Sequence, residues 1–399
     1  MEYKTYKLGT CFSLIENGAI IKQRKEAKGF PITRIETLSH GKFNRDKLGH
    51  ADIFDTTPYK RYILEDKDLI MSHINSRAFL GRTVLYRKKG NEQIIHGMNV
   101  LRIKTNEQFL DPVFASYLFK TSHFKKAIDS IRKDAINQSS INIFDICNIQ
   151  ISLPSITEQR KISHALQLID KKIETNHLIN DNLEAMAKQL YDYWFVQFDF
   201  PNEEGKPYKS SGGAMVWNDK LKREIPKEWM ASNYTDLFTI GNGQTMPQNE
   251  GLVPAYGGNG IVKMVEISNY PACIIIGRVG ANCGSIHYSK VPCWVSDNAI
   301  SICSKNDDWQ PFLFYSLKLY NLSKNKGGSS QPLITHEALK HLYFPMSEKH
   351  INQFCHIVNE LQDLIYSNQQ EILKLTKQRD ELLPLLMNGQ ATVNYHLLQ

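Results

Sequence analysis

The feature that most constrains the fold of this chain is a long internal repeat. Residues 162–195 and 354–387 align without gaps at a constant offset of 192 residues. The aligned pairs include Ile162 with Phe354, Leu166 with Val358, Ile169 with Leu361, Ile173 with Ile365, Asn176 with Asn368, Leu183 with Leu375, Leu190 with Leu382 and Trp194 with Leu386. Each copy follows a strand-like run that ends in a hydrophobic-proline step, Leu153-Pro154 or Phe344-Pro345, after which a helix can begin. A repeat of this length predicts a molecule with two related halves.

Within each copy the apolar positions are spaced alternately by four and three residues, which is the heptad pattern of a coiled coil. The first seam comprises Ile162, Leu166, Ile169, Ile173, Asn176, Asn180, Leu183, Ala187, Leu190 and Trp194. The second seam comprises Phe354, Val358, Leu361, Ile365, Asn368, Ile372, Leu375, Arg379, Leu382 and Leu386. The pattern also fits a pair of ordinary amphipathic core helices. We favour two long antiparallel helices packed against each other, each roughly 50 Å long at 1.5 Å per residue.

Both seams carry an asparagine near mid-length, Asn176 in the first and Asn368 in the second. A polar residue in such a seam costs stability, but it fixes the register and the orientation of the partner helix. Residues near the two midpoints meet when two helices run antiparallel. We therefore predict that Asn176 faces Asn368 and that the pair marks the helix register.

The regions that precede the two helices also repeat, more faintly. Residues 62–86 and 270–288 both have a strand, a polar turn with glycine and a second strand, and Asn99 in GMNVLRI corresponds to Asn298 in SDNAISI. The predicted fold class is α+β, with two target-recognition domains separated by two long antiparallel coiled-coil helices. We expect a pseudo-two-fold axis to relate the two halves. We assign residues 1–152 to the first domain, 153–199 to the central helical region, 200–225 to a surface connection, 226–343 to the second domain and 344–392 to the C-terminal helical region.

The charge of the chain is unevenly distributed. Its net charge is +7, but residues 1–150 carry 25 Lys and Arg against 16 Asp and Glu, whereas residues 226–343 carry 9 against 8. A basic segment is the electrostatic footprint expected for a polyanion partner, although a basic surface can also serve solubility alone.

No apolar run reaches the roughly 18 residues that span a bilayer, and the start MEYKTYKLGT has no signal-peptide core. We expect a cytoplasmic protein that makes no membrane contact.

Sequence signatures of common catalytic sites do not occur. The chain has no G-x-x-x-x-G-K-[ST] for nucleoside triphosphates, no H-E-x-x-H, no G-x-S-x-G and no Asn-Pro-Pro-aromatic motif of adenine methyltransferases. Cys273, Cys283, Cys293 and Cys303 stand singly in apolar segments, so we interpret them as buried thiols rather than as a zinc site. These absences favour a binding protein over an enzyme.

Both predicted domains offer polar side chains on loops. Arg and Lys suit guanine and phosphate, whereas Asn and Gln suit adenine. The candidates in the first domain are Lys22, Arg24, Lys25, Lys42, Arg45, His73, Asn75 and Arg77. The candidates in the second domain are Gln244, Tyr256, Asn259, Arg278, Asn282, Lys324, Lys326 and Gln331. Any one of them could be an ordinary surface residue, but their grouping on matching loops favours DNA contact. Because the two domains differ, we expect an asymmetric, bipartite target with an unread spacer.

Three segments carry a resemblance to a known family. They are LPSITEQRKISHALQLIDKKIETN (153–176), WFVQFDFPNEEGKPYKSSGGAMVWN (194–218) with the following IPKEW (225–229), and VPAYGGNGI to IIIGRVGANCGSI (253–286). They resemble the specificity (S) subunits of type I restriction-modification enzymes, over nearly the whole chain. The second helical region departs from the pattern, with SEKHINQF where the first has ITEQRKIS.

The resemblance implies a non-catalytic subunit that recognises double-stranded DNA. It further implies docking of two methyltransferase (modification) subunits on the helical regions, and of restriction subunits that translocate and cleave DNA. The chain itself would need no cofactor, and S-adenosylmethionine, ATP and Mg²⁺ would be bound by those partners. A related alternative is a specificity subunit whose partner carries methyltransferase and nuclease in one polypeptide. An enzyme with an unfamiliar active site and a coiled-coil scaffold without a DNA role remain further alternatives.

Overall fold

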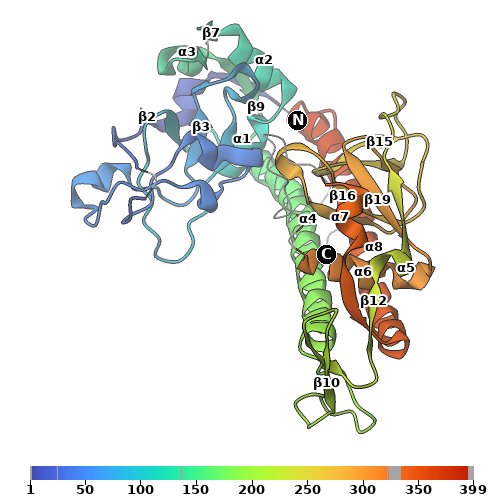
Figure 1. The fold of residues 1–399 in the computed structure, drawn as a ribbon. Helices are drawn as coiled ribbons and strands as arrows, with labels where there is room; N and C mark the ends of the chain where they lie inside the picture. The colour runs from blue at the N-terminus through green and yellow to red at the C-terminus, as the bar shows by residue number, and fades with distance from the viewer. Residues whose placement is uncertain (1, 25, 136–137, 321, 323–333, 394–399) are drawn as a thin grey trace. The chain divides into compact units, whose positions relative to one another are not determined.

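The computed structural model describes residues 2–24, 26–135, 138–320, 322 and 334–393 (Figure 1). The chain forms two compact units. Unit 1 comprises Met1–Ile173 and Leu373–Gln399, and unit 2 comprises Glu174–Ile372. Unit 1 is therefore built from two separate stretches of chain and unit 2 from one, and both boundaries between the units fall inside long helices.

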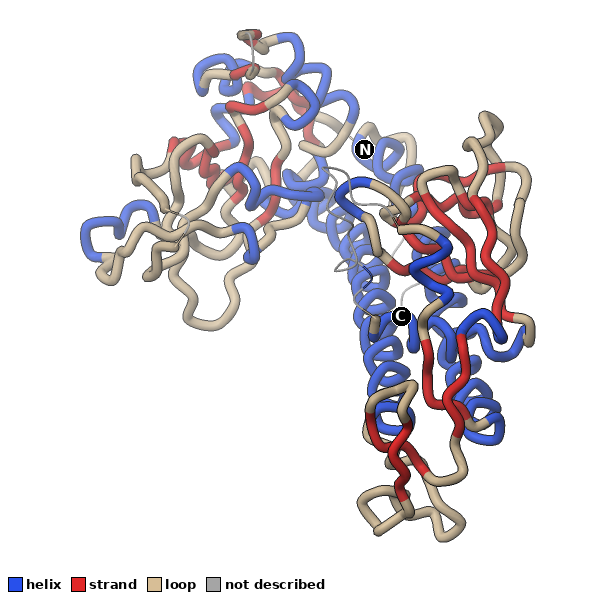
Figure 2. Tube along the Cα trace, in the orientation of Figure 1, coloured by secondary structure: helices blue, strands red, loops and turns tan. Residues whose placement is uncertain are grey.

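The main sheet of each unit has four antiparallel strands, which Figure 2 shows in red. In unit 1 the order is β2-β6-β3-β5, with β2 at Phe12–Asn17, β3 at Leu69–Ser72, β5 at Thr83–Leu85 and β6 at Val100–Thr105. In unit 2 the order is β13-β19-β16-β17, with β13 at Phe238–Asn242, β16 at Cys273–Gly277, β17 at Ile286–Ser289 and β19 at Ala299–Ser304. The two sheets have the same connectivity, so the faint repeat upstream of the helices is confirmed.

Smaller sheets repeat as well. A first pair joins the start of each domain to the strand before its helix: β1 (Lys4–Lys7) with β9 (Gln150–Leu153), and β12 (Met230–Asn233) with β20 (Tyr343–Met346). Unit 1 also has β4 (Ile74–Asn75), β7 (Lys133–Asp134) and β8 (Ser139–Ser140). Unit 2 also has β14 (Val253–Gly257), β15 (Gly260–Val265) and β18 (Trp294–Val295). A strand is present at both proline steps, and β9 ends before Pro154 as predicted. Strand β20 instead continues through Pro345 to Met346, so the second proline does not end its strand.

Short helices cover the sheets. The α-helices are α1 (Pro112–Leu118), α2 (Ser122–Ser130), α3 (Ile143–Asn148), α5 (Tyr234–Leu237), α6 (Gln310–Leu319) and α7 (His336–Lys340). The 3₁₀ turns are η1 (Leu8–Cys11), η2 (Ile35–Gly41), η3 (Arg45–Lys47), η4 (Thr57–Tyr62), η5 (Arg77–Phe79), η7 (Gly280–Asn282) and η8 (Asp307–Trp309). Asp111 caps the N-terminus of helix α1, because its side chain accepts hydrogen bonds from the N–H groups of Val113 and Phe114. No helix in these described ranges is long and apolar enough to cross a membrane.

The two long helices begin at the repeat offset. Helix α4 spans Ile156–Tyr191 and helix α8 spans Glu348–Met387, so their first residues are also 192 positions apart. All ten residues of the first predicted seam are buried or half-buried, and in the second seam only Leu382 is exposed. The heptad seams are therefore confirmed as the packed faces of the helices.

The helices pair antiparallel within each unit. In unit 1, Arg379 Nη1 donates to Asp170 Oδ1 at 3.0 Å. In unit 2, Asn368 Nδ2 donates to Asn180 Oδ1 at 2.9 Å, and Asn176 Nδ2 donates to Glu371 Oε2 at 2.7 Å. The predicted contact of Asn176 with Asn368 is wrong by one helical turn, since neighbouring positions on a packed face recur every three to four residues.

The segment between the halves is more structured than the predicted surface connection at residues 200–225. Helix α4 ends in a π-helical turn, η6 (Asp192–Val196), and a hairpin of β10 (Met215–Asn218) and β11 (Arg223–Pro226) follows. Phe195, Phe198 and Phe200 are buried against Trp229 in the core of unit 2. The aromatic residues of WFVQFDF thus hold the segment to the domain. The assigned domain boundaries stay a prediction.

Candidate nucleic-acid interface

Four loops of unit 2 meet at one end of its main sheet. They follow β13, join β14 to β15, join β16 to β17, and join β18 to β19. Together they form a hollow, which we call the asparagine hollow. It is lined by Met246, Gly257, Gly258, Asn259, Val262, Val279, Gly280, Asn282, Ser296, Asp297 and Asn298. No lysine or arginine is among the described residues that line it.

Backbone hydrogen bonds hold these loops against one another. The N–H of Gln244 donates to Val295 O at 2.9 Å, and the N–H of Asp297 donates to Gln244 O at 3.0 Å. The N–H of Arg278 donates to Asn298 O at 2.9 Å. The side chains that face the hollow are therefore carried on a fixed backbone, which base recognition requires.

Close backbone approach explains two glycines of this region. A Cβ atom on Gly243 would lie 1.7 Å from Ser296 O, and one on Gly277 would lie 2.4 Å from Asn282 O. Any larger residue at either position would push the loops apart. The glycines of GNG and IIIG are thus required by packing between loops.

The polar groups of the hollow have few partners. The side chains of Asn259, Asn282, Asp297 and Asn298 are exposed. Ser296 is 3% exposed, and its Oγ has no hydrogen-bond partner in the part of the chain that the structure describes. Amide, carboxylate and hydroxyl groups on a glycine-lined floor suit hydrogen bonds to the edges of bases better than contact with phosphate.

Unit 1 has the same backbone arrangement at the corresponding place. A Cβ atom on Gly18 would lie 2.1 Å from Gly97 O, as Gly243 meets Ser296 in unit 2. Asn99 has a φ of +73°, and its N–H donates to Asn17 Oδ1 at 3.2 Å. The loops of the two units therefore share a frame and differ in the side chains that they present.

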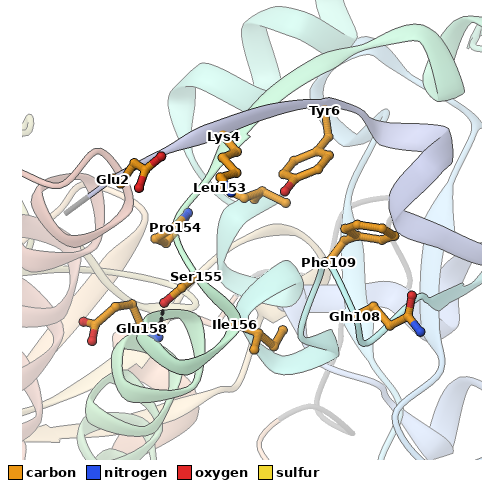
Figure 3. Close-up of a pocket in the computed structure, with 10 residues that line it drawn as sticks. All are labelled: Glu2, Lys4, Tyr6, Gln108, Phe109, Leu153, Pro154, Ser155, Ile156 and Glu158. Carbon is orange, nitrogen blue, oxygen red and sulfur yellow. Dashed lines mark hydrogen bonds between the residues drawn. The ribbon is translucent and has the colours of Figure 1, made fainter.

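A second hollow lies in unit 1 beside the start of α4 (Figure 3). Tyr6 and Phe109 pack there with ring centroids 5.4 Å apart, and Ser155 Oγ accepts a hydrogen bond from the N–H of Glu158 at 3.3 Å. Glu2 and Glu158 both line it. Lys4 also lines it, but the two carboxylates outnumber this one cation and oppose a phosphate, so we do not assign this hollow to nucleic acid.

Among the described residues, no group of three or more His, Cys, Asp or Glu side chains is arranged to hold a metal ion. Cys273, Cys283 and Cys293 are buried and Cys303 is half-buried, and the sulfur atoms of Cys273 and Cys293 lie 3.5 Å apart as free thiols. The interpretation of these cysteines as buried thiols is confirmed for the first three.

Comparison with known proteins decides the family. The sequence model of the type I restriction modification DNA specificity domain matches residues 1–185 and 226–382. The chain belongs to this family. Its members are DNA-recognition subunits of type I systems and do not carry the catalysis.

Individual relatives agree with the family. The chain is 27% identical to a protein of Methanocaldococcus jannaschii assigned as the MjaX type I restriction enzyme specificity subunit, over 98% of this chain and 94% of that protein. It is 27% identical to the MjaIX specificity subunit of the same organism, over 69% of this chain and 68% of the relative. The crystal structure of a type I S subunit from M. genitalium has a similar fold, with a TM-score of 0.60, 18% identity and 96% of both chains covered.

In unit 2 of this specificity subunit, several predicted DNA-contact residues lie together. Asn259 and Asn282 line the asparagine hollow, Gln244 is exposed beside Asp297, and Arg278 is half-buried next to the same loops. The prediction that Tyr256 contacts DNA must be corrected. Its side chain is 8% exposed and lies in the core with Cys273 and Cys293, and burial raises the pKa of its hydroxyl to about 12. Lys324, Lys326 and Gln331 lie outside the described residues.

In unit 1, Lys22 and Lys42 are exposed. Arg24 and Arg77 are exposed as well, but Arg24 is paired with Asp52 at 2.7 Å and Arg77 with Asp129 at 3.9 Å. Lys25 lies outside the described residues. The remaining candidates of this unit need correction.

Three side chains of unit 1 are occupied or buried. Arg45 Nε donates to Glu92 Oε2 at 2.9 Å and Arg45 Nη2 to Arg87 O at 2.7 Å, and the hydrogen bond from Arg45 lowers the pKa of Glu92 to about 2. His73 is 8% exposed, and burial lowers its pKa to about 4. Asn75 is half-buried, and both polar atoms of its side-chain amide form hydrogen bonds: Nδ2 donates to Ser72 Oγ, and Oδ1 accepts from the N–H of Ser76. These residues stabilise the loops.

Sequence reasoning missed Ser296, Asp297 and Asn298 as site residues. The signal was present, because SDN precedes the strand AISIC as GMN precedes VLRIK in the first half. Asn298 was recognised only as part of the repeat. A turn that precedes a buried strand in both halves marks the end of the sheet at which the asparagine hollow lies in unit 2.

Proposed function

We propose that the chain reads two different DNA half-sites, one with the loops of unit 1 and the other with the loops of unit 2. The observation that carries this proposal is the pairing of identical sheet connectivity with different loop chemistry. Unit 1 presents exposed cations such as Lys22, Lys42 and Arg77, whereas unit 2 presents the amides of the asparagine hollow. Two different readers in one chain specify an asymmetric, bipartite target with a spacer that is not read.

The partners follow from the family. We propose that two methyltransferase subunits dock on α4 and α8, and that restriction subunits join the full complex in the cytoplasm. S-adenosylmethionine, ATP and Mg²⁺ would be bound by these subunits. A partner that carries methyltransferase and nuclease in one polypeptide is the alternative arrangement.

Exposed apolar side chains support docking on the long helices. Ile179 and Met186 on α4 are 42% and 55% exposed, and Ile357 and Leu364 on α8 are 40% and 54% exposed. Each pair is seven residues apart and therefore lies on one face of its helix. Such residues on the surface of a helix indicate an interaction site when they gather.

The test of recognition is to co-express the chain with its cognate methyltransferase and to map N6-methyladenine across the host genome. We expect methylation at one split, asymmetric sequence with a spacer of constant length. A palindromic or uninterrupted target would contradict the proposal of two different readers.

A separate test addresses docking. Ile179→Glu with Leu364→Glu should abolish co-purification of the methyltransferase, because a charge in a desolvated apolar contact is unfavourable. Lys171→Glu, which places the same carboxylate on an exposed polar position of α4, is the matched control. Equal co-purification of both variants would contradict docking at these residues.

A further inference from the structure

The described lining of the asparagine hollow holds no lysine or arginine, the usual side chains that recognise guanine and phosphate. Guanine presents two acceptors, N7 and O6, in the major groove, and arginine or lysine is the usual donor to them. The described lining of the hollow holds amides, a hydroxyl and one carboxylate instead, together with the exposed apolar side chains of Val262 and Val279. Its chemistry therefore differs from that of a general DNA-binding surface.

Asp297 is the residue of the hollow with the most restrictive chemistry. An ionised carboxylate accepts hydrogen bonds and cannot donate them. The Asp297 side chain is exposed, and no described residue forms a hydrogen bond or an ion pair with its carboxylate. Its backbone is held by the bond to Gln244 O, and the N–H of Ala299 closes the same turn on Ser296 O at 2.9 Å. The backbone that carries the carboxylate is thus held in place, and the carboxylate itself has no structural partner among the described residues.

The neighbouring Ser296 gives an independent indication that the hollow receives a ligand. Its Oγ is buried at the lining of the hollow without a hydrogen-bond partner among the described residues. Burial of an unpaired hydroxyl is unfavourable, so such a group is expected to be satisfied by what binds there.

We propose that Asp297 is a specificity-determining residue that selects a base with an exocyclic amino group, adenine or cytosine, in the half-site read by unit 2. The N6 amino group of adenine and the N4 amino group of cytosine donate in the major groove, whereas guanine O6 and thymine O4 accept. When guanine O6 or thymine O4 lies opposite Asp297, neither this oxygen nor the carboxylate finds a hydrogen-bond donor, and the two repel each other. This inference rests on the proposed function and adds the class of base that one position requires.

The asparagines around Asp297 act differently. An amide both donates and accepts, so Asn259, Asn282 and Asn298 can pair with several base edges. Only the carboxylate excludes two of the four bases at a position. Asp297 therefore restricts the sequence more than any other residue of the hollow.

The experiment uses the full chain in complex with its methyltransferase and a plasmid library in which both half-sites are randomised. Methylated sites are read by sequencing. We expect one position of one half-site to be restricted to adenine or cytosine, with a preference of roughly 10-fold to 100-fold. In Asp297→Asn that preference should fall below about threefold, because the amide also donates to keto groups. All other positions should keep their preference.

Asp236→Asn is the matched control, because Asp236 is an exposed carboxylate of unit 2 in α5, outside the hollow. Its target should be unchanged. Asp297→Ala provides a second relaxed variant, and thermal melting of all three complexes verifies that they fold alike.

Two results would overturn the inference and leave the proposed function intact. One is an unchanged split target in both Asp297 variants. The other is a wild-type target in which no position of the half-sites, apart from the methylated adenines themselves, is restricted to amino-bearing bases. A target that is not split at all would instead overturn the proposed function.

Discussion

At the scale of single residues, unit 1 buries part of the charge that makes its sequence basic. Arg102 in β6 is 2% exposed, its Nε donates to Asp68 Oδ2 at 2.7 Å, and its Nη1 donates to Arg61 O at 2.8 Å. Burial raises the pKa of Asp68 even beside this guanidinium. A count of Lys and Arg along the sequence therefore overstates the charge available to DNA.

Removal of one partner of this buried pair should destabilise the fold. In Arg102→Ala the Asp68 carboxylate would be left buried and unpaired, and we expect the free energy of unfolding to fall by about 3–5 kcal/mol. Urea denaturation followed by circular dichroism measures the change, with the exposed Lys88→Ala as control. A loss in Arg102→Ala as small as in the control would show that the pair contributes nothing.

A buried histidine predicts how stability depends on pH. Burial, reinforced by the charge of Arg102, lowers the pKa of His96 to about 3. Above pH 6.5 the imidazole is neutral in the folded and unfolded states, so pH has no effect through it. Between pH 6.5 and about 3 only the unfolded state binds the proton, so stability falls as the pH falls.

We expect His96 to account for a loss of about 2 kcal/mol between pH 7 and pH 5, given an unfolded pKa of about 6.5. In His96→Gln the loss over this interval should be smaller by that amount, whatever the stability of the variant at pH 7. His123→Gln, an exposed histidine, should keep the wild-type dependence. Urea denaturation at the two pH values gives the comparison, and identical slopes in all three proteins would refute the assignment.

At the scale of elements, polar groups set how the long helices pair. The contacts of Asn180 with Asn368 and of Asn176 with Glu371 both lie in unit 2, among apolar seam residues. A buried amide that loses its partner is unfavourable, so each contact penalises a shift of one helix along the other. The register therefore depends on pairs of residues and not on either asparagine alone.

A double-mutant cycle distinguishes the observed pairing from the one that the sequence predicts. Replacement of Asn180 and Asn368 by Leu, singly and together, should give a coupling energy of about 1 kcal/mol. The same cycle on Asn176 and Asn368 should give a smaller coupling, because Asn176 donates to Glu371 and Asn368 donates to Asn180. Thermal denaturation of the variants provides the energies. Coupling in the second cycle and not in the first would restore the original prediction.

At the scale of the whole molecule, the two units differ in the charge that their loops present. The exposed cations of unit 1 suit phosphates, and the described lining of the asparagine hollow carries none. Non-specific binding depends on phosphate contacts and weakens with salt, whereas base contacts add specificity. We infer that unit 1 supplies more of the salt-dependent affinity.

Replacement of Lys22, Lys42 and Arg77 by Ala should therefore weaken binding to duplexes of any sequence. Each lost phosphate contact reduces the slope of log K against log salt by about 0.9, so the triple variant should lose up to about 3. Fluorescence anisotropy of the methyltransferase complex between about 50 and 200 mM salt measures the effect. Lys206→Ala, an exposed lysine between the halves, is the control, and an unchanged slope in the triple variant would contradict the proposed phosphate contacts.

The sequence alone determined the periodic and repeated features of this protein. The offset of 192 residues, the buried seams and the strands at the two proline steps all follow from local patterns, because side-chain period and proline geometry act within a few residues. The membership of a DNA-specificity family was also legible, since its motifs are contiguous. These features needed no knowledge of contacts between distant segments.

Only the tertiary structure decided which polar side chains are available to a ligand. Arg45, His73 and Tyr256 stand in polar or glycine-rich segments like the true surface residues, yet packing of distant strands buries or pairs them. Asp297 became a candidate because the loops after β13, β14 and β16 meet around it. Exposure depends on contacts between residues far apart in the chain, and a one-dimensional pattern does not record them.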